Sequence, residues 1–136
     1  MTTSSCCDCD IRTTFPAIPE AVDLLSLEFR RRARSRLAHR QCFLAELLIR
    51  EALNNAVFHG CGADPQRDVR CRLRLRGRRL VVSVHDDGAG FDWRAAVQKP
   101  PGAAEVSGRG ISILLAFATR IRFNKRGNHV TIVKQF

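Results

Sequence analysis

Residues 69–76 alternate strictly between apolar side chains and arginine, and this pattern limits the possible folds more than any other feature of the chain. The apolar set is Val69, Cys71, Leu73 and Leu75, and arginine fills every position between and after them. Successive side chains of a β-strand point to opposite faces, so one face of this strand is buried and the other is wet and basic. A strand of this kind is typical of an antiparallel sheet that is covered on one side only.

The remaining patterns predict helices for the covered side. Apolar residues recur at helical spacing in three segments. The strand-like runs occur in pairs, and each of the two hairpin pairs is joined by a turn, one at Gly77-Arg78 and one that contains Gly127. The expected strands are residues 11–15, 69–76, 80–85, 120–123 and 129–134, and the expected helices are residues 20–37, 41–58 and 111–118. We therefore expect an α+β fold, a two-layer sandwich whose mainly antiparallel sheet is covered on one face by helices.

Length and charge narrow the class of protein. The 136 residues suit one domain at roughly 150 residues per domain, and we assign residues 1–10 to a flexible tail and 11–136 to a single domain. A net charge of +10 favours anionic partners. The longest apolar run, residues 111–118, is far short of the ~20 residues that span a bilayer. We expect no membrane segment and no signal peptide, and therefore a cytoplasmic protein whose cysteines are reduced. Cys6, Cys7 and Cys9 lie close together, but no second pair of ligands has the spacing of a zinc site.

Glu51 and Asn55 are the first candidate site residues. They are one helical turn apart, so their side chains share a face at the edge of an apolar stripe, and His59 continues the row. Polar groups beside a core are costly unless they are satisfied, and such exceptions tend to mark functional sites. The alternative is an ordinary pair on a helix surface.

A second candidate follows the strand at residues 80–85. The alternation places Asp86 on the core side where that strand ends, and Gly88 and Gly90 allow a tight turn with space beside the carboxylate. A carboxylate in this position can accept a hydrogen bond from an exocyclic amine such as that of adenine. The alternative is a simple Asp-Gly turn.

A third candidate is Gly108-Arg109-Gly110, which directly precedes the expected helix at residues 111–118. Free N–H groups and the positive end of a helix dipole suit a phosphate. A lone GxG is also typical of a loop that needs flexibility. Neither a P-loop nor a Rossmann fingerprint occurs in the sequence.

The order and spacing of the three motifs resemble the N, G1 and G2 boxes of the GHKL ATPase superfamily, the Bergerat fold. The stretches REALNNAVFHG, VHDDGAGFD and SGRGISIL are similar to those of the RsbW/SpoIIAB-like group, which are anti-sigma factors and also serine protein kinases. The resemblance extends over residues 15–136.

This resemblance implies a role for each motif. Asn55 would ligate Mg²⁺ that bridges the phosphates of ATP, Glu51 would act as the general base, and Asp86 would hold the adenine amine. The glycines would shape the adenine pocket or close a lid over the phosphates, namely Gly88, Gly90, Gly108 and Gly110. Lys99 and Arg109 are our candidates for additional cations at the phosphates.

The chain departs from the family pattern before its last strand. The family often has a Gly-Thr pair there, and its threonine helps to bind adenine. Here Asn128 and His129 follow Gly127, and Thr131 comes later. We include Thr131 among the candidate nucleotide-binding residues, and the choice among these residues stays open at this point.

The function that the resemblance implies is an ATP-dependent serine kinase that phosphorylates a STAS-domain anti-anti-sigma protein and also binds a sigma factor, as a homodimer. An alternative is a non-catalytic ATP-binding module that switches between partners. A histidine kinase catalytic domain is disfavoured, because His39 lies in an arginine-rich segment without a preceding dimerisation helix. Direct nucleic-acid binding is disfavoured because the arginine-rich strand has no interleaved aromatic residues.

Overall fold

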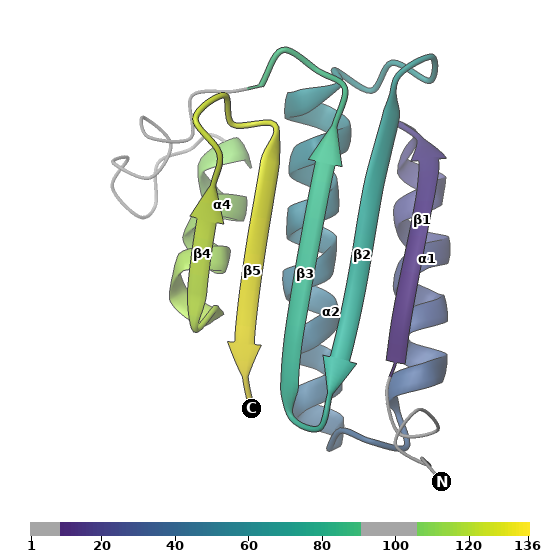
Figure 1. Ribbon diagram of the computed structural model, residues 1–136, viewed down its shortest axis with the longest axis vertical. Helices are drawn as coiled ribbons and strands as arrows, with labels where there is room; N and C mark the ends of the chain where they lie inside the picture. Colours follow the sequence, from purple (N-terminus) through teal and green to yellow (C-terminus); the bar gives the residue numbers. More distant parts are fainter. Residues whose placement is uncertain (1–8, 91–105) are drawn as a thin grey trace, which may run out of the picture.

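A five-stranded antiparallel sheet forms one layer of the structure and helices form the other (Figure 1). The structure is a computed structural model that describes residues 9–90 and 106–136. In chain order its elements are β1 Cys9–Pro16, α1 Pro19–Ala33, α2 His39–Asn54, the π-helix η2 Asn55–Gly60, β2 Asp68–Arg76, β3 Arg79–Asp86, α4 Val106–Phe117, β4 Arg120–Phe123 and β5 His129–Gln135. The strand order is β1-β2-β3-β5-β4, so the expected α+β sandwich is confirmed.

The arginine-rich strand β2 contributes its apolar face to the core, as the alternation predicts. All four apolar side chains of β2 are buried beneath the helices, and Leu73 is paired with Ile11 of β1 and Val82 of β3. These neighbours are buried too, so the middle of the sheet contributes a continuous apolar layer. The intervening arginines lie on the opposite face, which no described element covers.

Both long helices differ from the expected ranges at their ends. Pro19 occupies the first turn of α1, where its missing N–H costs nothing. The helix ends at Ala33 rather than residue 37, because Leu37 is buried in the core from the connection to α2 instead of from a further helical turn. Helix α2 begins at His39, where the N–H of Ala38 donates to Oε1 of Gln41.

The end of the second predicted helix is a π-helix, which corrects the expected row of Glu51, Asn55 and His59. The hydrogen bonds of a π-helix span five residues instead of four, so the wider turn of η2 rotates the side chains that follow. Asn55, Ala56 and Val57 are therefore all buried, whereas His59 is exposed. The predicted row therefore contains Glu51 and Asn55 but not His59.

Two further boundaries also need correction. The strand β1 begins at Cys9, so Cys9 and Asp10 belong to the sheet and not to the tail, and residues 1–8 lie outside the described part of the chain. Helix α4 begins at Val106, so Gly108 and Gly110 lie within it rather than before it. Burial of Ile111 and Leu114 outweighs the low helix propensity of glycine, about 1 kcal/mol each.

The helices of the described residues are too short or too polar to cross a membrane.

The core packing generates a stability prediction. Phe29 of α1 is fully buried, and Phe29→Ala should lower the free energy of unfolding by about 3–5 kcal/mol, because it leaves a cavity between the layers. The matched control is Leu27→Ala on the same helix, whose side chain is 56% exposed and should change stability by less than about 0.5 kcal/mol. Urea unfolding measures both values. Equal losses in the two variants would contradict this packing.

Candidate functional site

The side chain of Asp86 is buried at the end of β3, and only 4% of the residue is exposed. Its Oδ1 accepts a hydrogen bond from the N–H of Gly88 at 2.8 Å, and its own N–H donates to the carbonyl of Asn128 at 2.9 Å. None of the ion pairs among the described residues includes Asp86. Burial raises the pKa of this carboxyl above its ordinary value, although the Gly88 N–H opposes the shift.

Two glycines allow the backbone to approach this carboxylate. A Cβ on Gly60, at the end of η2, would lie 2.6 Å from Oδ1 of Asp86, and a Cβ on Gly88 would overlap the carbonyl of Gly60. Any side chain at either position would therefore push the π-helix away from the end of β3. Gly90 has a φ of +88°, and its Cβ would overlap the carbonyl of Arg126 in the β4–β5 connection.

Gly60 is a site residue that is not among the candidates of the three sequence motifs. The sequence contains one signal for it, because two glycines occur close together where a single glycine is enough to end the helix. Gly62 has a φ of +61°, which suits the turn after the helix, so a second glycine two residues earlier needed another explanation. The structure supplies that explanation, because Gly60 packs against Asp86.

The side chain of Asn55 lies in the helical layer and lines the same cavity as Asp86. It is 8% exposed, and its Nδ2 is buried without a hydrogen-bond partner in the described structure. Asn55 and Asp86 line one narrow cavity of about 10 Å³. A buried amide atom without a partner is costly, so a ligand at this position would satisfy a group that the protein leaves unpaired.

Glu51 lies one turn before Asn55 and is half-buried on α2. Burial alone raises the pKa of its carboxyl above the ordinary value. No ion pair among the described residues involves this side chain. Glu51 therefore combines partial burial with an unneutralised carboxyl, which is unusual for a residue that only supports a helix surface.

Asn128, and not Thr131, contacts the backbone of Asp86. Asn128 is 8% exposed, and its Nδ2 donates to the Asp86 carbonyl at 3.5 Å. Asn124 fixes it by accepting from the Asn128 N–H and donating to its side-chain oxygen. The alternation of β5 buries Val130 and Ile132 toward the helices, so Thr131 lies on the uncovered face of the sheet and does not join Asp86.

The remaining predicted residues lie at the edge of the described structure. The backbone of Gly108, Arg109 and Gly110 belongs to the first two turns of α4, and the side chain of Arg109 is outside the described part. Lys99 also lies outside it. The structure thus brings together Asn55, Asp86 and Gly88, with Glu51 one helical turn from Asn55, and it packs Gly90 against Arg126 of the β4–β5 connection.

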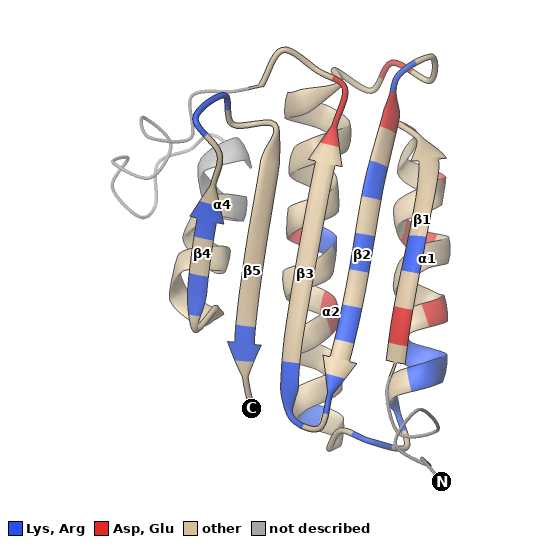
Figure 2. Cartoon of the chain, viewed as in Figure 1, with Lys and Arg blue, Asp and Glu red and all other residues tan. Residues whose placement is uncertain are grey.

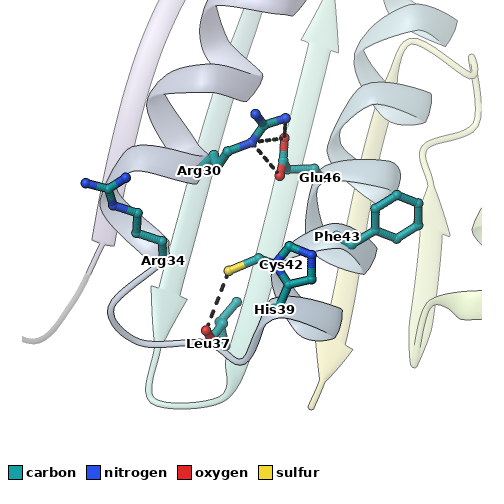
Figure 3. A pocket seen from close by; sticks show the side chains of 7 residues that line it. All are labelled: Arg30, Arg34, Leu37, His39, Cys42, Phe43 and Glu46. Atoms are coloured by element: carbon teal, nitrogen blue, oxygen red, sulfur yellow. Dashed lines mark hydrogen bonds and ion pairs between the residues drawn. The ribbon is translucent and has the colours of Figure 1, made fainter.

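A larger cavity of about 480 Å³ lies between α1 and α2 (Figure 3). Its polar wall is the ion pair of Arg30 with Glu46, at 2.8 Å, while the ring of Phe43 forms an apolar wall. The Cys42 thiol points toward the carbonyl of Leu37, and burial raises its pKa, which disfavours a nucleophilic thiolate. We therefore do not assign a catalytic residue to this cavity.

Comparison with known proteins shows the family to which the chain belongs. Residues 15–134 match the family of the histidine kinase-like ATPase domain. The chain is also similar to the serine/threonine-protein kinase BtrW of Bordetella bronchiseptica, with 32% identity over 107 residues, or 73% of this chain and 74% of that protein. The matched family segment contains every described candidate residue, and an ATPase domain implies that the nucleotide is ATP. The chain belongs to the histidine kinase-like ATPase domain family.

Proposed function

We propose that the protein is an ATP-dependent serine kinase and anti-sigma factor of a partner-switching system. Its substrate is a serine of a STAS-domain anti-anti-sigma protein, and its sequestered target is a sigma factor. The observation that carries the proposal is the unpaired, buried amide of Asn55 one helical turn from the unneutralised Glu51 and beside Asp86. Similarity to a relative named a serine/threonine-protein kinase supports transfer to a protein.

Asp86 recognises the adenine in this proposal. Oδ1 is occupied by the Gly88 N–H, so the carboxylate keeps acceptor capacity for the exocyclic amine. The close approach of Gly60 and Gly88 fixes the direction of that carboxylate before the nucleotide binds. A preorganised acceptor recognises an amine without a further cost of ordering.

Asn55 fits the Mg²⁺ that such a reaction requires. The oxygen and nitrogen of an amide exchange places by a half-turn rotation, so the unpaired position of Nδ2 can present Oδ1 instead. Mg²⁺ prefers oxygen ligands, keeps several waters, and is commonly held by one or two protein groups together with phosphates. When bound, the metal would neutralise charge on the phosphates.

Glu51 takes the proton from the attacking serine. The serine oxygen forms a bond to the γ-phosphorus, the bond to the bridging oxygen of ADP breaks, and ADP leaves with that electron pair. The serine proton passes to the Glu51 carboxylate. Because burial raises the pKa of Glu51, this carboxylate is a stronger base than an exposed glutamate.

We also assign the first turn of α4 to phosphate binding. The N–H groups of a first helical turn have no partner within the helix and carry the positive end of the helix dipole; Gly108 belongs to this turn of α4, and Gly110 to the next. Lys99 and Arg109 remain candidates for additional positive charge. We also propose that the protein acts as a homodimer, as the family resemblance implies.

A non-catalytic switch that only binds ATP and a partner is the second candidate, and one experiment separates the two. The purified protein is incubated with Mg-ATP and each STAS-domain protein of the same organism, and the products are weighed by mass spectrometry. The kinase adds one phosphate to a serine. Binding of ATP without phosphate on any of these proteins would favour the passive switch.

Adenine recognition predicts a clear difference between two neighbouring carboxylates. Asp86→Asn should weaken ATP binding by more than about tenfold, because an amide N–H would face the adenine amine as donor against donor. Asp87→Asn is the matched control, since Asp87 is exposed, and it should bind ATP like the wild type. Isothermal titration calorimetry measures both. An undiminished affinity in Asp86→Asn would contradict the assignment.

The role of Glu51 predicts loss of transfer without loss of binding. Glu51→Gln should lower the rate of phosphate transfer by about 10²–10⁴-fold and leave ATP affinity within a factor of about two, because the residue acts on the serine proton. The rate follows from time-resolved mass spectrometry. A variant that still transfers phosphate at the wild-type rate would exclude Glu51 as the base.

The same substitution predicts a pH-dependent gain in stability. The Glu51 pKa is raised in the folded state, so the unfolded chain ionises more easily and stability falls as the pH rises from about 4.5 through the raised value. Glu51→Gln removes this loss. The melting temperature of the variant minus that of the wild type should therefore increase over this window and stay constant above it. A difference that shrinks as the pH rises would contradict the burial of an uncompensated carboxyl.

A further inference from the structure

The face of the sheet opposite the helices carries eight arginines and two carboxylates. We call it the open face, because no described element covers it (Figure 1). Alternation along the strands places on it Arg12, Arg70, Arg72, Arg74, Arg76, Arg79, Arg120 and Arg122, together with Asp10 and Asp68. A concentration of charge of one sign favours a partner of the opposite sign.

The arginines form two rows with a neutral band between them. One row follows β2, with Arg12 beside it, and the other follows β4 (Figure 2), while Arg79 lies at one end of β3 opposite Arg76. The band between the rows consists of small, apolar and imidazole side chains from β3 and β5, namely Val81, Ser83, His85, His129, Thr131 and Val133. Three strand spacings separate β2 from β4, about 14 Å in all, and a helix with its side chains is about 10–12 Å wide.

Hydrogen bonds hold both histidines of the band against their neighbours. An N–H of Arg70 donates to Nδ1 of His85 at 2.8 Å, so this nitrogen is an acceptor and carries no proton. His129 shares a hydrogen bond with Ser83, and burial together with the neighbouring His85 lowers its pKa. The six residues of the band include no lysine or arginine, so the arginine charge of the open face lies along its two flanks and, with Arg79, at one end of β3.

Several guanidinium groups of the open face are available to a partner. Arg72 is held by both oxygens of Asp10, at 3.2 and 3.0 Å. In the described structure no ion pair involves Arg12, Arg120 or Arg122, and Nε of Arg74 is buried without a hydrogen-bond partner. A buried donor without an acceptor costs free energy, so a partner that supplies an acceptor to Arg74 would remove this cost.

We propose that the open face docks an acidic helix of a partner protein. The helix lies along the neutral band with small or apolar residues beneath it, and its two flanks carry carboxylates that meet the two arginine rows and Nε of Arg74. A nucleic acid fits less well, because the strand residues of this face include no phenylalanine or tryptophan for stacking.

This surface lies on the other side of the sheet from the nucleotide site. Asp86 and Asn55 are buried between the sheet and the helices, so a helix on the open face does not cover them. Docking therefore does not depend on the proposed kinase activity. Failure of one proposal leaves the other intact, and Asp86→Asn should bind the acidic helix normally.

The test uses a synthetic helical peptide of about 18 residues, with an alanine and leucine stripe flanked by two rows of glutamate. A second peptide with glutamine in place of every glutamate is its control. Titration into ¹⁵N-labelled protein should shift the backbone amide signals of Ser83, Thr131 and Val133 and leave those of Asn55 and Asp86 in place. Equal binding of the two peptides, or shifts centred on Asn55 and Asp86, would overturn the proposal.

Charge-reversal variants locate the contact. Arg12→Glu with Arg122→Glu changes one exposed residue in each row and should weaken peptide binding at least about tenfold. Arg34→Glu with Arg40→Glu changes the net charge equally on the helical layer and should keep the wild-type affinity. Circular dichroism verifies that both variants are folded. Equal weakening in both pairs, or tighter binding of a short DNA duplex than of the acidic peptide, would overturn the proposal.

Discussion

The buried carboxylate of Asp86 is the group on which the geometry of the candidate site depends. It ends the central strand β3, and the π-helix, the Asp86–Gly90 turn and the β4–β5 connection all pack around it. Removing a carboxylate from water is costly, and no described ion pair offsets the cost here. Such a group is poorly explained by stability and well explained by a ligand that it must recognise.

The π-helix connects this carboxylate to the rest of the site. An α-helical continuation of α2 would have turned the residues after Asn55 to other faces, whereas the wider turn buries three successive residues and brings Gly60 against Asp86. Glu51 stays on the α-helical part, one turn away. The helical layer therefore supplies the proposed base and metal ligand, and the sheet supplies the proposed adenine acceptor.

The sequence predicted the strands well because their signal is local. Alternation in β2 and β3, turn residues between them and apolar spacing in the helices were enough to predict both layers and the burial of Asp86. The helix ends were less accurate, because Leu37 has helical spacing but reaches the core from a loop. Periodicity cannot distinguish these two ways of burying one side chain.

The contacts of the site were less predictable, because they join distant segments. Gly60 and Gly88 meet across 28 positions of sequence, and Asn128 reaches the backbone of Asp86 across 42. The π-helix leaves no period in the sequence, so the exposure of His59 was not foreseen. Thr131 was selected by residue type, whereas the pleat of β5 turns it to the open face and leaves Asn128 beside Asp86.

Recognition of the adenine amine by Asp86 is the central claim, and one comparison of nucleotides tests it directly. The affinity for ATP is measured by calorimetry against that for purine riboside triphosphate, which lacks only the 6-amino group. Loss of one hydrogen bond to a buried charged group should weaken binding by about ten- to a hundredfold. Equal affinities for the two nucleotides would contradict the claim, because the buried carboxylate would then have no amine to recognise.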